Sequence, residues 1–175
     1  MPMFKIVGPT TVKFQSLNTR TENHGMEKVP AMDIFISLPM HADILDSFDP
    51  ALKDFLFQKY ANIKEPDLLG DHEEENEGVL DWRFREIKGI PWEYKGAGYR
   101  FVIWSALDDE ESTTKRKEDV ILIMTNISKF KFAPRKGGEV DVSFKIAASP
   151  NAKDAGRLYE LQGSEVDISL EPPRL

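Results

Sequence analysis

The last third of the chain alternates apolar and polar residues more regularly than any other part. In residues 139–146 every second side chain is apolar, and residues 127–133 repeat the pattern around Phe130 and Phe132. A period of two residues is typical of a strand with one buried and one exposed face. Residues 134–138, Pro-Arg-Lys-Gly-Gly, supply a turn between the two runs. This stretch therefore predicts an antiparallel β-hairpin.

The preceding stretch, residues 119–124, is apolar without alternation, because five apolar residues follow one another from Val120 to Met124. A short continuous apolar run is typical of a strand that is covered on both faces. We therefore expect this strand to be buried on both sides.

A helix followed by a strand is predicted after the hairpin. Residues 151–162 place apolar side chains at helical intervals, either Ser149 or Asn151 can cap the N-terminus, and Gly163 is a natural stop. Residues 165–170 then return to alternation. The C-terminal part thus predicts the order hairpin, helix, strand.

Shorter signals occur earlier in the chain. Asp49 followed by proline predicts a helix over residues 50–60. Residues 91–94 and 99–107 predict a second hairpin across a glycine-containing turn. Residues 18–28 are polar and favour local turns at the surface.

Together these patterns predict an α+β fold, with a twisted, mostly antiparallel sheet of about seven to nine strands and two helices packed on it. A chain of 175 residues has the size of one domain. We therefore expect a single domain over residues 1–175.

The amino-acid composition excludes several classes of site and indicates where charge is concentrated. The chain has no cysteine, which excludes disulfides and thiolate sites, and its formal net charge is −7. Residues 65–77 contain seven acids and no Lys or Arg. We interpret residues 63–78 as an acidic mobile loop and residues 108–118 as a second charged loop.

No apolar run is long enough to cross a bilayer and the first residues lack a signal peptide, so we expect a cytoplasmic protein without a membrane partner.

Motifs for catalysis are missing from the sequence. His72 lies among acids, but no second histidine is at ligand spacing, so we predict no metal site. There is no phosphate-binding loop, nucleophile elbow or dinucleotide fingerprint, so we predict no cofactor. Carboxylates lie in charged segments rather than in apolar pockets. We therefore do not expect an enzyme.

Aromatic and basic residues are interleaved in the middle of the chain. Single-stranded nucleic acid is commonly held by aromatic faces and by Lys or Arg on a β surface. The alternative is an ordinary half-buried sheet, with the aromatic side chains in its core; Trp92, Tyr94 and Trp104 are the aromatics that we expect at the surface. The candidate nucleic-acid-binding residues are Trp92, Tyr94, Lys95, Arg100, Lys129, Lys131, Arg135 and Lys136.

Two segments of the chain are similar to segments of known proteins. They are residues 18–25, Asn-Thr-Arg-Thr-Glu-Asn-His-Gly, and residues 29–34, Val-Pro-Ala-Met-Asp-Ile. With residues 48–52, 91–99 and 134–138, they resemble a group of uncharacterised proteins of tailed bacteriophages. That group looks like early, non-virion proteins encoded among recombination and replication genes. The resemblance implies a setting in DNA metabolism or host interaction, in the cytoplasm of the host bacterium, and no catalytic residue comes with it.

Two functions remain open from the sequence. The first is an accessory protein of phage replication or recombination that binds single-stranded DNA through the basic and aromatic surface. The second is an acidic protein-binding or inhibitory module that mimics nucleic acid or binds a host or defence protein. The partner is therefore single-stranded nucleic acid or a host or phage protein, and a homo-oligomer is a further alternative.

Overall fold

The computed structural model describes residues 3–59, 80–104 and 119–174. Strands make up 61% of these residues, and the three helices are short. The acidic segment 63–78 and the charged segment 108–118 lie outside the described residues.

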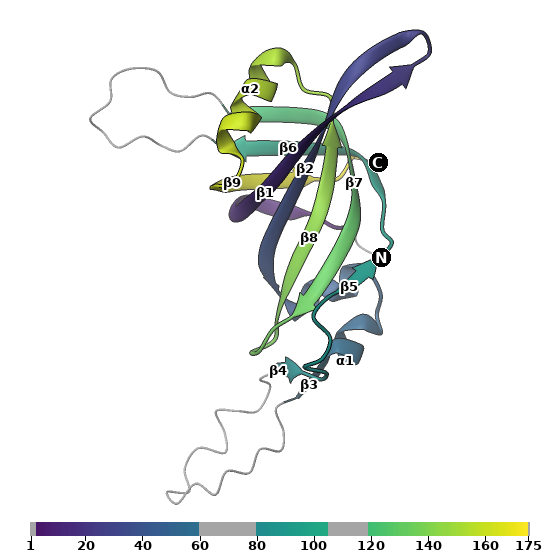
Figure 1. Cartoon of the computed structure of the whole chain (residues 1–175). Helices are drawn as coiled ribbons and strands as arrows, with labels where there is room; N and C mark the ends of the chain where they lie inside the picture. Colours follow the sequence, from purple (N-terminus) through teal and green to yellow (C-terminus); the bar gives the residue numbers. More distant parts are fainter. Residues whose placement is uncertain (1–2, 60–79, 105–118, 175) are drawn as a thin grey trace, which may run out of the picture. The chain divides into compact units, whose positions relative to one another are not determined.

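The elements appear along the chain in the order shown in Figure 1. The strands are β1 (Ile6–His24), β2 (Glu27–His41), β3 (Phe57–Lys59), β4 (Leu80–Trp82), β5 (Ile90–Trp92), β6 (Gly96–Trp104), β7 (Val120–Pro134), β8 (Glu139–Ala148) and β9 (Glu165–Glu171). The helices are the 3₁₀ helix η1 (Ala42–Ser47) and the α-helices α1 (Leu52–Leu56) and α2 (Ala152–Leu161).

The described residues form two compact units. The first unit contains the described parts of Pro39–Pro91 together with Lys131–Val142. The second unit contains Met3–Leu38, Trp92–Phe130 and Ser143–Leu175, again where they are described. The prediction of one domain over residues 1–175 stays a prediction.

Six strands, all or most of each in the second unit, close into a barrel. Their order is β7-β6-β9-β1-β2-β8, and pairing between β7 and β8 completes the ring. The prediction of a mostly antiparallel sheet is confirmed, because β1–β2, β1–β9, β6–β7 and β6–β9 are all antiparallel. An α+β sheet with packed helices is not confirmed, since the sheet closes on itself and the helices are short. Closure removes free sheet edges, so helices are not required to cover them.

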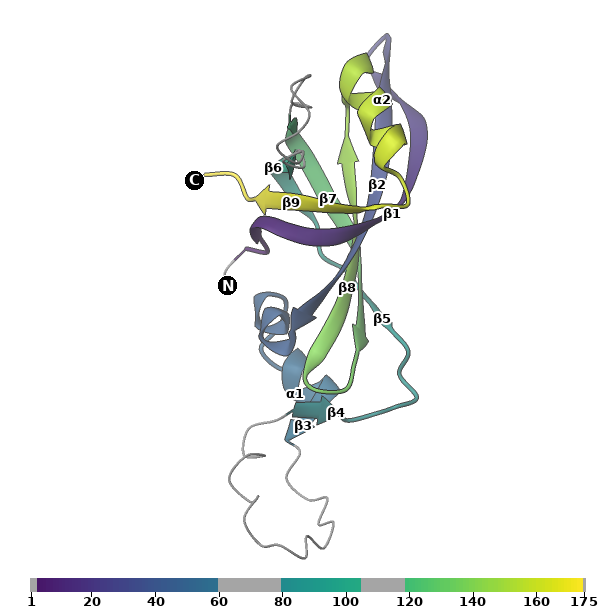
Figure 2. The ribbon, with the colours of Figure 1, turned by 90° about the vertical axis from the view of Figure 1, so that its left-hand side faces the viewer.

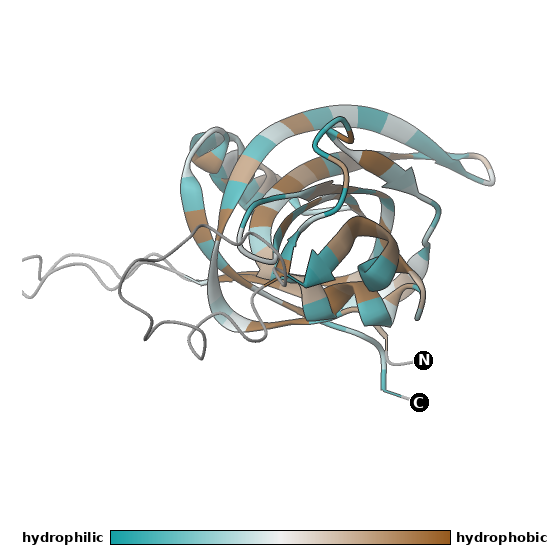
Figure 3. Ribbon diagram, turned by 90° about the horizontal axis from the view of Figure 1, so that it is seen from below, coloured by the Kyte–Doolittle hydropathy of each residue, from teal (hydrophilic) through white to brown (hydrophobic). Residues whose placement is uncertain are grey.

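The core of the second unit is aromatic. The Phe4 ring meets Phe130 edge-on at 5.1 Å and Phe144 at 5.4 Å between centroids, while Phe130 and Phe144 stack at 5.2 Å. All three side chains are buried. Figure 3 shows hydrophobic and hydrophilic residues alternating along the strands, as the sequence pattern requires.

The C-terminal part follows the sequence prediction. β7 and β8 are joined by the predicted turn, where Gly137 and Gly138 both take positive φ values of 85° and 76°. Asn151 caps α2, since its Oδ1 accepts a hydrogen bond from Asp154 N at 2.8 Å. Gly163 (φ 85°) leads from α2 into β9 (Figure 2). Local residue chemistry was sufficient for these elements.

The predicted helix over residues 50–60 is wrong for residues 57–59, and residue 60 lies outside the described residues. The α1 helix ends at Leu56, and Phe57 begins the strand β3, which pairs with β4 in the first unit. Phe57 is buried there, and Arg83 N donates to the Leu56 carbonyl at 2.8 Å. Pairing with a distant segment therefore overrides the helical spacing.

Two further predictions are corrected by strand pairing. The polar residues 18–24 continue β1 as a strand, in register with β2 from Asn18–Asp33 to His24–Glu27. Ladder hydrogen bonds form along the backbone, so exposed polar side chains do not prevent them. The segments 91–94 and 99–104 do not form a hairpin with each other, because β7 lies between β5 and β6 in the sheet, and residues 105–107 of the predicted hairpin lie outside the described residues.

The strand at residues 119–124 is not covered on both faces. Val120 and Leu122 are buried, but Ile121, Ile123 and Met124 are 47%, 71% and 75% exposed. A barrel strand has one inner and one outer face. The register also shifts between Tyr99 and Phe101 of β6, and Met124 takes a positive φ of 55° there, which turns two neighbouring side chains outward.

Candidate functional site

The outer face of the second unit presents an aromatic and a basic side chain on one strand. In β6, Phe101 and Ile103 are buried in the core, whereas Trp104 is 41% exposed and Arg100 is also exposed. Because side chains alternate along a strand, Arg100 and Trp104 lie on the same outer face. In the neighbouring strand β9, Glu171 lies opposite Arg100.

A bulge in β1 borders this surface. The register between β1 and β9 shifts between Ile6 and Thr10, so residues 7–9 stand opposite Ser169 alone. Gly8 lies directly over β9, since a Cβ at this position would be 2.6 Å from the Cβ of Ser169. Only glycine allows this close approach of the two strands.

Trp104 lies against the same bulge. Its Nε1 is 3.0 Å from the place that a Cβ of residue 8 would take. The missing side chain of Gly8 therefore makes room for the edge of the indole ring. The Nε1 edge of the ring lies against the bulge, while 41% of the residue remains exposed.

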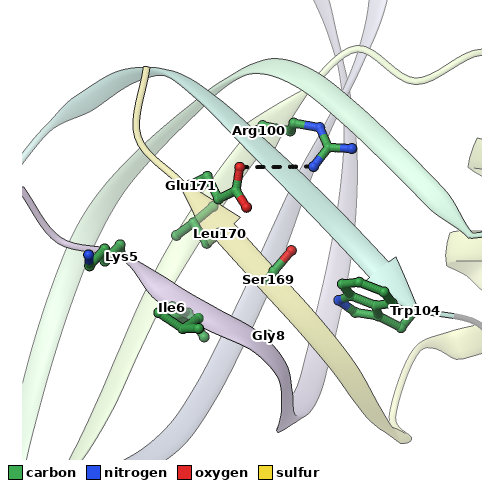
Figure 4. Close-up of a pocket in the computed structure, with 9 residues that line it drawn as sticks. Lys5, Ile6, Gly8, Arg100, Trp104, Ser169, Leu170 and Glu171 are labelled. Carbon is green, nitrogen blue, oxygen red and sulfur yellow. Dashed lines mark ion pairs between the residues drawn. The ribbon is translucent and has the colours of Figure 1, made fainter. Parts of the chain in front are cut away.

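Between these elements lies a hollow of about 370 Å³ (Figure 4). This size is at the lower end of pockets for small ligands. We call it the Trp104 hollow. It is lined by Lys5, Ile6, Val7, Gly8, Arg100, Trp104, Ser169, Leu170 and Glu171.

The rim of the Trp104 hollow carries two cations and one carboxylate. Arg100 Nη1 and Glu171 Oε2 are 4.0 Å apart, and both side chains are about half exposed. An exposed pair at this distance contributes little stability and can exchange partners. Lys5 is exposed and forms no ion pair with any described residue. The rim can therefore attract a small anion through Lys5 and Arg100, while Glu171 opposes it.

Four of the predicted site residues lie near the other end of β6. Gly96 is eight residues before Trp104 on β6, which corresponds to roughly 26 Å along a strand. Tyr94 is built into the packing: its ring meets Phe130 edge-on at 5.3 Å, and its hydroxyl accepts from Phe4 N at 3.4 Å. Trp92 is half-buried, while Lys95 and Lys129 are exposed.

The remaining predicted residues, Lys131, Arg135 and Lys136, belong to the first unit. Arg135 Nε is paired with Asp141 Oδ2 at 2.6 Å, and the Lys131 side chain lies over the backbone of Gly89. Lys136 is exposed in the turn between β7 and β8. Of the eight predicted residues, only Arg100 lines the Trp104 hollow.

Sequence reasoning did not single out Lys5, Gly8 or Ser169. The Gly8-Pro9 pair inside a strand pattern was one available signal, because glycine and proline there indicate a bulge. Ser169 carried no signal of its own, since an outward serine is ordinary in a half-exposed strand. Its place follows from pairing with a strand more than 150 residues earlier, as the Thr11–Asp167 hydrogen bond at 2.6 Å illustrates.

A second surface feature is apolar. The exposed side chains of Ile121, Ile123 and Met124 lie on the outer face of β7. Ile121 and Ile123 also line a hollow of about 250 Å³ together with Pro150 and the start of α2. We call these three residues the β7 apolar patch. Adjacent exposed apolar residues of this kind often mark interaction surfaces.

Charge is distributed unevenly along the chain. The described residues carry 19 Lys and Arg against 18 Asp and Glu, whereas the whole sequence has 23 against 30. The acidic excess therefore falls entirely on the short segments outside the described ranges. The described surface has no general bias against an anionic partner.

Within the described ranges, no three His, Asp or Glu side chains are grouped as metal ligands. None of the helices described has the length and apolar character of a membrane span. The fold and surface define a mostly-β barrel protein with a hollow on its outer face. No protein-family model, curated protein or solved structure matches this chain.

Proposed function

We propose that this chain is a non-catalytic protein that binds single-stranded nucleic acid on the outer face around Trp104. The observation that carries the proposal is the exposed indole of Trp104, which shares one hollow with the cations Lys5 and Arg100. Aromatic faces stack with bases of any sequence, and Lys or Arg side chains follow the phosphates. The resemblance to early phage proteins favours a setting in phage replication or recombination.

The charge balance supports single strands over duplex DNA. Binding to duplex DNA by neutralising many phosphates requires a broad basic surface. The Trp104 hollow has only two cations beside the carboxylate of Glu171. A short contact of one or two nucleotides, held partly by stacking, fits this surface better.

The test is titration of a fluorescently labelled oligo-dT with the protein at low and at physiological salt. Trp104→Ala should weaken binding by about 1–3 kcal/mol if a base stacks on the indole. Tyr159→Ala is the matched control, because Tyr159 is an exposed aromatic of α2 that does not line the hollow. Lys5→Gln should reduce the salt dependence of log Kd by about 0.7 for one lost phosphate contact. Glu171→Gln should strengthen binding.

Absence of binding at low salt would refute the proposal. Equal effects of Trp104→Ala and Tyr159→Ala would also count against it, since the hollow would then have no special part in binding.

The second candidate function is protein binding, and the β7 apolar patch favours it. Replacing Ile121 and Ile123 by threonine preserves β-branching and strand propensity while adding a hydroxyl to each exposed side chain. We expect the double variant to keep its melting temperature within a few degrees and to lose a partner that the wild-type chain retains from host lysate. A partner retained equally by both proteins would exclude the patch as its binding surface.

A further inference from the structure

Ser169 is an outward-facing residue that is nevertheless almost completely buried. Its neighbours Ile168 and Leu170 point into the core, so the Ser169 side chain belongs to the outer face of β9. The bulge of β1 covers it at Gly8, which leaves Ser169 only 4% exposed. It forms part of the Trp104 hollow.

The Ser169 hydroxyl has no hydrogen-bond partner among the described residues. Neighbouring Thr11 shows the usual arrangement, because its hydroxyl donates to Asp167 at 2.6 Å. The Ser169 oxygen is not among the fully buried unpartnered atoms of the described residues, so the small exposed part of this residue includes its hydroxyl. Because Ser169 lines the hollow, a polar group that enters it can replace water as the hydrogen-bond partner.

The other walls of the hollow restrict what can enter. Figure 4 shows Ser169 between Glu171 and Trp104, with Arg100 above and Lys5 on the far side. A planar ring of a ligand can stack on the Trp104 indole. The Ser169 hydroxyl can form one hydrogen bond with the edge of that ligand ring. Lys5 and Arg100 supply positive charge at the rim. A planar polar ring joined to an anion is the chemistry of a nucleotide.

From this arrangement we infer that the Trp104 hollow is a subsite for one nucleotide, in which the base lies on Trp104 and hydrogen-bonds to the Ser169 hydroxyl. The phosphate lies toward Lys5, because Lys5 forms no ion pair with a described residue, whereas Arg100 is paired with Glu171. This inference rests on the proposed binding of single-stranded nucleic acid and adds a contact to the base itself. A free mononucleotide and a nucleotide within a strand share this chemistry.

The test compares Ser169→Ala with wild-type protein on three probes: oligo-dT, the same oligonucleotide with an abasic site at every second position, and free dTMP. Ser169→Ala should lower the affinity for oligo-dT about 2- to 10-fold, the effect of one lost hydrogen bond. The salt dependence should not change, because no charge is removed. The abasic oligonucleotide should bind more weakly to wild-type protein and be less sensitive to the variant.

Ser143→Ala is the matched control, since Ser143 lies on β8 of the same unit and does not line the hollow. It should bind all three probes as the wild-type protein does. Melting temperatures of both variants establish that folding is preserved.

The outcomes separate the inference from the proposed function. Oligo-dT binding that depends on Trp104 but not on Ser169 would overturn the inference and leave the proposed function intact, with water as the partner of the hydroxyl. Binding of dTMP that is weakened by Ser169→Ala, without oligonucleotide binding, would support the subsite and refute the strand-binding function. Failure of every probe to bind would overturn both.

Discussion

Tyr99 connects the N-terminal segment to the barrel through one buried hydroxyl group. The residue is 0% exposed, and its hydroxyl donates to the Phe4 carbonyl at 2.8 Å. Burial, with a smaller contribution from a hydrogen bond with Tyr94, raises the pKa of Tyr99 far above its ordinary value. The folded state therefore keeps this phenol protonated.

Replacing Tyr99 by phenylalanine should lower the free energy of unfolding by about 1–3 kcal/mol, because the buried Phe4 carbonyl loses its donor. Urea denaturation at neutral pH measures this difference. Tyr159→Phe is the control, since Tyr159 is 53% exposed and its hydroxyl can bind water. Equal unfolding free energies for wild type and Tyr99→Phe would contradict the assigned contact.

The same substitution should change the pH dependence of stability. The pKa of Tyr99 is higher in the folded chain than in the unfolded chain, where it is about 10. Its contribution is therefore complete below pH 10 and is lost as the pH rises above that value, because the unfolded state releases the proton first. Wild-type protein should lose more stability between pH 10 and 11 than Tyr99→Phe does.

At the scale of elements, Gly8 in the strand β1 and Gly156 in the helix α2 differ in the space around them. In β1, a Cβ at Gly8 would lie 2.6 Å from both the Ile168 carbonyl oxygen and the Ser169 Cβ. In α2, a Cβ at Gly156 would meet no atom within 4 Å. One glycine therefore permits a close strand contact, and the other only adds flexibility to a helix.

Gly8→Ala should destabilise the protein by about 1–3 kcal/mol through overpacking, whereas Gly156→Ala should stabilise it by about 1 kcal/mol through helix propensity. Thermal unfolding of the two variants beside wild type gives both signs in one experiment. Gly8→Ala should also weaken oligo-dT binding, because Trp104 loses its place against the bulge. A stabilising effect of Gly8→Ala would contradict the strand contact.

The pairing of whole elements explains why polar residues 18–24 form a strand. Arg20 Nε binds Asp33 Oδ1 across the β1–β2 pair at 3.0 Å, and Arg20 also pairs with Glu22. The hydrogen bonds that Arg20 donates to these carboxylates raise the pKa of Arg20 and keep it charged. Cross-strand pairs of opposite charge support a strand whose composition favours turns.

At the scale of the whole molecule, the net charge of the full sequence differs from the net charge of the described residues. The formal charge of −7 arises outside the described ranges, which contain 12 Asp and Glu but only 4 Lys and Arg. A local cationic rim such as that of the Trp104 hollow is therefore compatible with an acidic protein. Salt screens both the repulsion of phosphate by the acidic segments and its attraction by Lys5 and Arg100.

Sequence alone determined the elements whose signals are local. Alternation placed Val140, Val142, Phe144 and Ile146 on the buried face of β8, and the Asn151 cap with the Gly163 stop bounded α2. Period, capping and turn chemistry act over a few residues, so they can be recognised without a fold. Interleaved aromatic and basic residues placed Arg100 among the candidate binding residues, whereas Trp104 was expected only as an aromatic at the surface.

Tertiary structure decided everything that depends on which strands become neighbours. It ended α1 at Leu56 in favour of β3, exposed Ile121 and Ile123 on the outer face of the barrel, and packed Tyr94 against Phe130. The Trp104 hollow exists only because β1 and β9 pair with a bulge and β6 lies beside them. Register between segments distant in sequence is set by the closing of the whole sheet, and no local pattern encodes it.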